Sequence, residues 1–174
     1  SYYSVAENKS HTVIYTIGTD GKNEKLLTTA STSEVAPKFI DGGKRIAYLG
    51  MADDGNMQLF SMNADGTDRK QLSREAEGVD DFTFSPDGKK VLMIKTIKYG
   101  KRTKDNYSDL DKASGRVIDQ LMYRHWDEWV ETIPHAYVAD FDGTDIKNAT
   151  DILNGEPYEC PMKPFGGIEQ LAWS

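Results

Sequence analysis

The octapeptide FSPDGKKV at residues 84–91 joins one apolar run to the next through a tight turn. Pro86 fixes φ for the first central position of the turn, Asp87 can accept a backbone hydrogen bond, and Gly88 tolerates the left-handed region. A related octapeptide, FIDGGKRI, stands 45 residues earlier at residues 39–46. A turn between apolar runs that recurs at a fixed distance predicts a repeated β-hairpin.

A second motif keeps the same period. VIYTIGTDG at residues 13–21 aligns with QLFSMNADG at residues 58–66, again at an offset of 45. A third copy, YVADFDGT at residues 137–144, follows the second at an offset of 77, so about 32 residues are inserted between them. The tripeptide AWS at the end of the chain aligns with residues 83–85 only if a second insertion, of about 12 residues, precedes it. The repeats are therefore predicted at about 11–55, 56–97 and 133–174, with insertions at about 98–132 and 151–167.

Each repeat has the pattern of short antiparallel strands. Apolar and β-branched runs are separated by Asp-Gly pairs, which supply the positive φ that tight hairpins need. A unit of about 45 residues with roughly four such strands has the size of a propeller blade. We predict an all-β fold, a partial β-propeller of about three to four four-stranded blades with one helical insertion; a β-sandwich or another repeated sheet is the alternative.

The last motif stops before its turn, and the repeats are too few for the four to eight blades of a closed ring. The sequence is therefore interpreted as a fragment of a longer protein. Open strand edges of an incomplete propeller are templates for pairing with a second copy, so self-association through edge strands is expected.

Composition excludes several classes of protein. The 174 residues are 38% hydrophobic and 28% charged, as in soluble domains, and no apolar stretch is long enough to span a membrane. A net charge of −7 opposes binding to nucleic acid. Cys160 is the single cysteine, and the three histidines lack the spacing of metal ligands, so no metal site and no cofactor are predicted. The histidines are expected at the surface or at strand edges.

The first insertion is predicted to be helical over 109–131, with Ser114 as its N-cap. Its apolar residues recur at steps of three and four, and carboxylates lie between them. In one interpretation the tryptophans pack the insertion onto the protein and the carboxylates face solvent. In the other, some carboxylates enter a cavity and bind a cationic group. The candidate binding residues are Arg124, His125, Trp126, Asp127, Glu128 and Glu131.

The second insertion is predicted to be an irregular loop, because three prolines and the pair Gly166-Gly167 interrupt regular structure between 151 and 167. Long loops on a rigid scaffold often carry recognition. The candidate binding residues in this loop are Glu156, Tyr158 and Glu159. Cys160 has no partner base that the sequence identifies, so a nucleophilic role is not predicted.

The motifs resemble those of known families. FSPDGKK at residues 84–90 resembles the TolB-like or WD40-like propeller repeats of bacterial proteins. YRHWDEW at 123–129, PHAYVAD at 134–140 and GEPYECP at 155–161 are similar to the N-terminal propeller of prolyl oligopeptidase-family (S9) serine peptidases, in the dipeptidyl-peptidase and acylaminoacyl-peptidase branch. The insertions make this resemblance specific, since the repeat motif itself is generic.

The resemblance implies a function for the chain. In that family the propeller covers an α/β-hydrolase domain with a Ser-Asp-His triad and restricts access to short or unfolded peptides. This sequence has no Gly-x-Ser-x-Gly motif, so no catalytic residue is assigned to it; the full-length parent is expected to be a serine exopeptidase with a C-terminal hydrolase domain.

The resemblance also implies that acidic residues on a propeller insertion bind the amino terminus of the peptide substrate, with Asp127, Glu128 and Glu131 in a similar insertion. A periplasmic or otherwise exported location in a bacterium is expected from relatives of this branch. The alternative is a TolB-like propeller that binds protein partners and has no peptidase activity.

Overall fold

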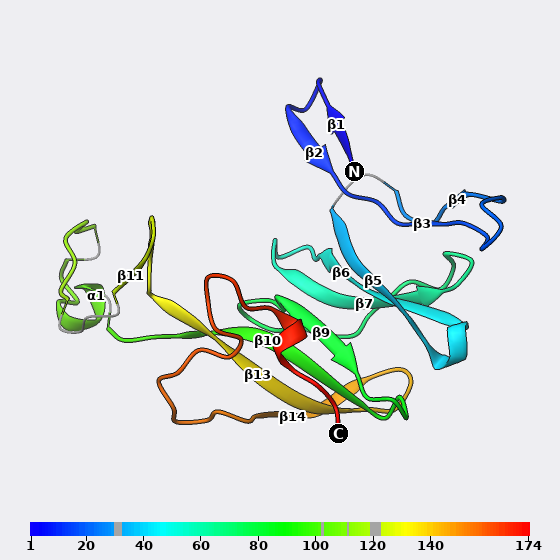
Figure 1. Ribbon diagram of the computed structural model, residues 1–174. Helices are drawn as coiled ribbons and strands as arrows, with labels where there is room; N and C mark the ends of the chain where they lie inside the picture. Colours follow the sequence, from blue (N-terminus) through cyan, green and yellow to red (C-terminus); the bar gives the residue numbers. More distant parts are fainter. Residues whose placement is uncertain (30–32, 102, 111, 119–122) are drawn as a thin grey trace.

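Two four-stranded antiparallel sheets form the body of the protein, for which we describe a computed structural model (Figure 1). The structure describes residues 1–29, 33–101, 103–110, 112–118 and 123–174. The first sheet has the order β5-β6-β7-β8 and the second β9-β10-β13-β14. Their strands are β5 (Glu34–Ile40), β6 (Arg45–Met51), β7 (Met57–Asn63), β8 (Lys70–Gln71), β9 (Asp81–Phe84), β10 (Lys90–Lys98), β13 (Thr132–Phe141) and β14 (Ile146–Asp151). The predicted all-β fold with antiparallel four-stranded units is confirmed.

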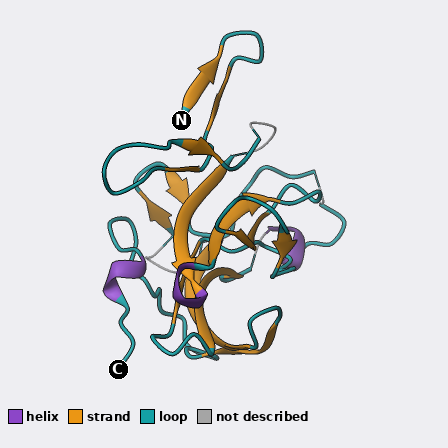
Figure 2. Ribbon diagram, turned by 90° about the vertical axis from the view of Figure 1, so that its right-hand side faces the viewer, coloured by secondary structure: helices purple, strands orange, loops and turns teal. Residues whose placement is uncertain are grey.

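Three small hairpins and three short helical turns complete the described secondary structure. Figure 2 shows the first hairpin extending away from the two sheets. The hairpins are β1 (Tyr2–Ser4) with β2 (Lys9–His11), β3 (Tyr15–Thr16) with β4 (Lys25–Leu26), and β11 (Arg124–His125) with β12 (Glu128–Trp129). The helical turns are η1 (Asp41–Gly43), α1 (Thr103–Asn106) and η2 (Ile168–Gln170). None of the described helices has the length and apolar character needed to cross a membrane.

The period of 45 residues reappears in the pairing of the strands. In the first sheet Phe39 lies opposite Ile46, and in the second sheet Phe84 lies opposite Val91. Both pairs flank the turn motifs that define the repeat, so these motifs are the hairpins that link the first and second strands of each sheet. Sheet register is set by which face must be buried, and the same apolar pattern therefore produces the same register twice.

The outer strands repeat as well. The short pair β3–β4 has the register of β7–β8 shifted by 45 residues, so it corresponds to the outer hairpin of a preceding blade. The amide of Ile14 donates to Oγ1 of Thr28 at 2.9 Å, and the amide of Leu59 donates to Oγ of Ser73 at 2.8 Å. A buried amide needs a partner, and a hydroxyl 14 residues later supplies it in both copies.

The first insertion lies between β10 and β13, the second and third strands of the second sheet. Arg45 pairs with Asn63 in the first sheet, and Lys90 pairs with Asp140 in the second. These pairs reproduce the offsets of 45 and 77 that were read from the sequence. In the first sheet a short turn joins the two strands, whereas in the second the pairing continues to Lys98 opposite Thr132 and an excursion follows (Figure 1).

The main apolar core lies between the two sheets. Phe82, Leu59 and Met93 are fully buried in it, and the ring of Phe84 packs edge-on against Phe141 with centroids 4.9 Å apart. A second cluster covers the opposite face of the second sheet, where Cys160 and Trp173, from the second insertion and the last residues of the chain, pack against buried residues. Those buried residues are Leu92, Ile94 and Ala136.

The amphipathic helix predicted over 109–131 is wrong. The only helix described in the first insertion is α1, which is short and precedes that range, while β11 and β12 form a hairpin with His125 opposite Glu128. Residues 111 and 119–122 of the predicted helix lie outside the described residues. Val117 and Ile118, two members of the three- and four-residue pattern, are exposed at 48% and 47%, so the pattern does not mark one buried helix face.

The Asp-Gly turns are built alike in different blades. The carboxylate of Asp65 accepts the amide of Thr67 at 2.9 Å, and that of Asp142 accepts the amide of Thr144 at 3.0 Å. The glycine between each pair has positive φ, 90° at Gly66 and 95° at Gly143. Asp side chains that bond their own backbone two residues on are a common device of turns, and glycine supplies the conformation.

We predict that alanine is tolerated less well at residue 66 than at residue 143. At Gly66 an added Cβ would lie 3.1 Å from the carbonyl oxygen of Leu27, whereas at Gly143 nothing lies within 4 Å. Both substitutions strain the backbone by about 1 kcal/mol, and Gly66→Ala adds a steric cost of about 1–3 kcal/mol. Urea unfolding of the two variants measures the difference. Equal losses of stability would show that the hairpin β3–β4 does not pack against this turn.

Candidate functional site

The hairpin β11–β12 presents most of the residues that were predicted to bind substrate. Trp126 and Asp127 form its two-residue turn, and the amide of Val130 donates to the carbonyl oxygen of Tyr123 at 3.0 Å. Trp126 has φ of 50°, in the left-handed region that bulky residues seldom adopt. Two-residue hairpin turns usually place asparagine, aspartate or glycine at this position. The turn therefore holds a large aromatic side chain in a conformation that has to be supported by contacts elsewhere.

The two insertions meet at a polar contact. Nε2 of His125 donates to Oε1 of Glu159 at 2.8 Å, and Oε2 of Glu159 accepts the amide of Lys163 at 3.3 Å. The Glu159 side chain is only 6% exposed, while that of His125 is 24% exposed. Hydrogen bonds to an ionised group are stronger than neutral ones, and this carboxylate has little water to replace them.

An aromatic contact lies beside the polar one. The rings of Trp126 and Phe165 meet edge to face, with centroids 5.2 Å apart. Both side chains are nonetheless largely exposed, at 72% and 81%. Such pairs contribute roughly 0.5–1.5 kcal/mol beyond the area they bury. The contact joins the turn of the hairpin to the second insertion and leaves most of both rings open to solvent.

On the other strand of the hairpin, two guanidinium groups contact the ring of Trp129. Arg116 is 4.5 Å and Arg124 is 5.2 Å from the centre of its ring, and the ring of Tyr123 lies 6.2 Å away. Arg116 also forms an ion pair with Glu131. Cation–π contacts of this kind favour one orientation of the indole ring. The contact with Trp129 places Arg124 in a supporting role, and the ion pair with Arg116 engages the carboxylate of Glu131.

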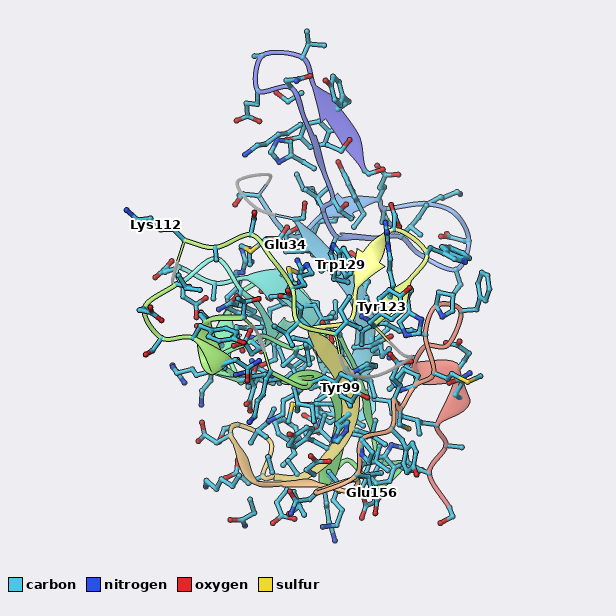
Figure 3. The ribbon with its side chains drawn as sticks, turned by 90° about the vertical axis from the view of Figure 1, so that its left-hand side faces the viewer. Glu34, Tyr99, Lys112, Tyr123, Trp129 and Glu156 are labelled. Atoms are coloured by element: carbon cyan, nitrogen blue, oxygen red, sulfur yellow. The ribbon has the colours of Figure 1, made fainter. Side chains whose placement is uncertain are left out.

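The remaining predicted residues are distributed unevenly. Asp127 is exposed in the turn, and its carbonyl oxygen accepts a hydrogen bond from Arg124 at 3.4 Å. The side chain of Glu128 lies outside the described part of the structure. Glu156 is exposed and stands well apart from Tyr123 and Trp129, which lie near each other (Figure 3). Tyr158 is 65% exposed. Glu156 is therefore not part of the hairpin site.

One polar cluster at the base of the insertions was not found from the sequence. His135 was expected at the surface or at a strand edge, but it is fully buried, and its Nδ1 lies 2.9 Å from Oδ2 of Asp151. Nearby, the ammonium group of Lys95 contacts Glu75 at 2.8 Å and lies 3.7 Å above the ring of Tyr137. Glu75 belongs to the segment that links the two sheets, so the cluster ties them together near the insertions. A lone histidine carries no sequence signal of such a partner.

The single thiol is part of the scaffold. Cys160 packs in the apolar cluster on the second sheet, and its amide donates to the carbonyl oxygen of Pro134 at 2.9 Å. Burial raises the pKa of the Cys160 thiol, which disfavours the thiolate that a nucleophile needs. The residue fixes the position of the second insertion on β13.

Comparisons with known proteins link the chain to peptidases. No family model matches the sequence. It is 52% identical over all 174 residues to dipeptidyl-peptidase 5 of Porphyromonas gingivalis, and 44% identical over 97% of the chain to dipeptidyl-peptidase 5 of Porphyromonas endodontalis. The chain spans only about a quarter of the length of these relatives, 25% and 24% respectively. The predicted resemblance to the dipeptidyl-peptidase branch is confirmed.

Solved structures confirm the fold. Acylaminoacyl peptidase of Pyrococcus horikoshii matches 86% of the chain with a TM-score of 0.58 at 16% identity, and the chain covers 22% of it. TolB of Agrobacterium tumefaciens matches 80% of the chain with a TM-score of 0.53 at 20% identity, and the chain covers 40% of it. At these identities the likeness concerns the fold alone.

We predict that the stability contributed by Asp151 disappears in acid. Burial works to raise the pKa of Asp151, but hydrogen bonds from His135, the Leu153 amide and Tyr137 hold that pKa below its usual value. A carboxyl group whose pKa is lowered by folding stabilises the protein above its unfolded pKa, about 3.9, and this stability is lost as the pH falls through the folded pKa. Urea unfolding of Asp151→Asn and the wild type should differ most near neutral pH and converge below about pH 4. A difference that does not change with pH would contradict this role of the pair.

Proposed function

We propose that this chain is the non-catalytic propeller segment of a serine dipeptidyl peptidase. The chain is similar along nearly its whole length to the bacterial dipeptidyl-peptidase 5 proteins, and it spans about a quarter of the length of each of them. In this proposal the propeller restricts the access of peptides to a C-terminal α/β-hydrolase domain, and its insertions bind the amino terminus of the substrate. Export to the periplasm belongs to the same proposal. The observation that carries it is the 52% identity over all 174 residues, insertions included.

The contacts of the hairpin narrow the choice of the group that binds the amino terminus. Glu131 is engaged by Arg116, and Glu159 is engaged by His125 and is nearly buried. Glu156 lies apart from the hairpin. Asp127 is exposed at the turn, beside the open ring of Trp126. We therefore assign the ammonium group of the substrate to Asp127, and Glu128 keeps the role predicted from the sequence.

The chemistry of this position suits an ammonium ion. A carboxylate makes charge-assisted hydrogen bonds to an ammonium group, and these strengthen when a bound peptide excludes water. The face of an indole ring attracts the same cation. Asp127 and Trp126 are adjacent in the turn, and both are exposed to solvent. A propeller that only binds protein partners would share the fold, as TolB does, but it gives no reason for an exposed carboxylate and indole on a supported hairpin.

We predict that Asp127→Asn in the full-length protein lowers kcat/KM for dipeptide substrates with a free amino terminus by about 10- to 100-fold. The loss corresponds to one hydrogen bond to a charged group, about 1.5–3 kcal/mol. Steady-state kinetics with a chromogenic dipeptide measures it. Glu156→Gln is the matched control, since it neutralises an exposed carboxylate away from the hairpin. An Asp127→Asn enzyme with an unchanged preference for free over acetylated amino termini would show that Asp127 does not bind this group.

A further inference from the structure

The hairpin β11–β12 is too small to hold its own shape. Each of its strands has two residues, and isolated hairpins even longer than this are marginal in water. Its turn also places Trp126 at φ of 50°, a conformation that persists only where surrounding contacts impose it. The position of Asp127, the next residue in the turn, therefore depends on contacts made outside the hairpin.

Two of those contacts come from the second insertion and lie at the turn itself. His125 precedes the turn and is bound by Glu159, and Trp126 begins the turn and packs against Phe165. These partners lie 34 and 39 residues further along the chain. The polar contact is the better shielded of the two, because the Glu159 side chain is only 6% exposed whereas the aromatic rings are mostly open.

The second insertion is itself anchored to the second sheet. The residue after Glu159 is Cys160, whose amide bonds to Pro134 on β13 and whose side chain lies in the apolar cluster. At the start of the insertion, Asp151 accepts the amide of Leu153 at 2.9 Å and is held by buried His135. The loop that carries Glu159 is thus fixed at both sides to one strand, and it can transmit that position to the hairpin.

We propose that the second insertion is a latch, in which Glu159 and Phe165 act as positioning residues that hold the hairpin β11–β12 and thereby fix the site of Asp127. That Glu159 and Phe165 hold the hairpin depends only on their contacts with His125 and Trp126. The effect of the latch on peptide substrates rests on the proposed function. Neither Glu159 nor Phe165 needs to touch the substrate for the latch to act.

Amide hydrogen exchange in the full-length protein tests the latch directly. Glu159→Ala should accelerate exchange at the Val130 amide, which closes the hairpin, by at least about 10-fold, because loss of a hydrogen bond to a charged group shifts the opening equilibrium by about that factor or more. Exchange in the pair β6–β7 should stay unchanged. Glu159→Gln keeps an oxygen that accepts from His125, so it should restore much of the protection. Glu156→Ala, in the same loop, is the matched control.

Kinetics of the same variants link the latch to substrate binding. Glu159→Ala should raise KM for dipeptides about 5- to 50-fold with little change in kcat, because the hairpin must be ordered before Asp127 binds the amino terminus. A double-mutant cycle of His125→Ala with Glu159→Ala should be strongly non-additive, since each removes the same bond. Phe165→Ala, at a mostly exposed side chain, gives a second test that does not disturb the core.

The outcomes separate the latch from the proposed function. Unchanged exchange at Val130 in both Glu159→Ala and Phe165→Ala overturns the latch, whatever the kinetics show. Faster exchange with an unchanged KM, in an enzyme whose KM does respond to Asp127→Asn, overturns the role of the latch in substrate binding and leaves the proposed function standing. If KM responds to neither change, the assignment of the substrate amino terminus to Asp127 fails, and faster exchange still supports the latch as a structural device.

Discussion

The ladder between β10 and β13 is the constraint on which the insertions depend. Nine residue pairs join these strands, from Lys90 opposite Asp140 to Lys98 opposite Thr132. The ladder closes the long first insertion at its base and is buried by apolar clusters on both faces. Its strand β13 also receives the second insertion, because the carbonyl oxygens of Pro134 and Ala136 accept the amides of Cys160 and Ile152. One strand thus carries both excursions and brings them together.

This arrangement explains why the insertions can be irregular while the blades stay regular. A hairpin between the second and third strands of a blade can be extended without changing the register, since the pairing simply continues outward before the excursion begins. The entropy of closing a longer loop grows slowly with its length, so an insertion of about 32 residues is tolerated if its ends are held. The sheets hold these loops in place. The residues of the loops that bind a ligand can therefore change without loss of the fold.

The part of the fold with a repeating local signal could be predicted, and the rest could not. Asp65 and Gly66 recur as Asp142 and Gly143 because each turn meets its own backbone requirements locally, so a pattern of a few residues is enough. The register of the sheets and the place of the first insertion follow from that period. The secondary structure of the insertion does not, because short spacing patterns do not distinguish a helix from a hairpin, and the aromatic contact at the hairpin turn joins Trp126 to Phe165, far along the chain.

The candidate site shows the same division. The residue types that suit an ammonium ion could be listed from the sequence. Which of these carboxylates are already paired with a cationic side chain could not be predicted. Glu159 and Asp127 are both carboxylates beside aromatic residues in the sequence. Only the folded chain shows that Glu159 is buried against His125 whereas Asp127 is exposed. Buried His135 was missed for the same reason, since its partner Asp151 comes from the neighbouring strand. Pairing between distant residues is a property of the folded chain.

The central claim is that the two insertions form one unit on β13. A crystal structure of the full-length protein at a resolution that shows side chains tests this claim most directly. We expect the His125 ring within hydrogen-bonding distance of the Glu159 carboxylate, Trp126 against Phe165, and Lys90 opposite Asp140 in the β10–β13 ladder. A hairpin that packs elsewhere, with Glu159 facing solvent, would contradict it.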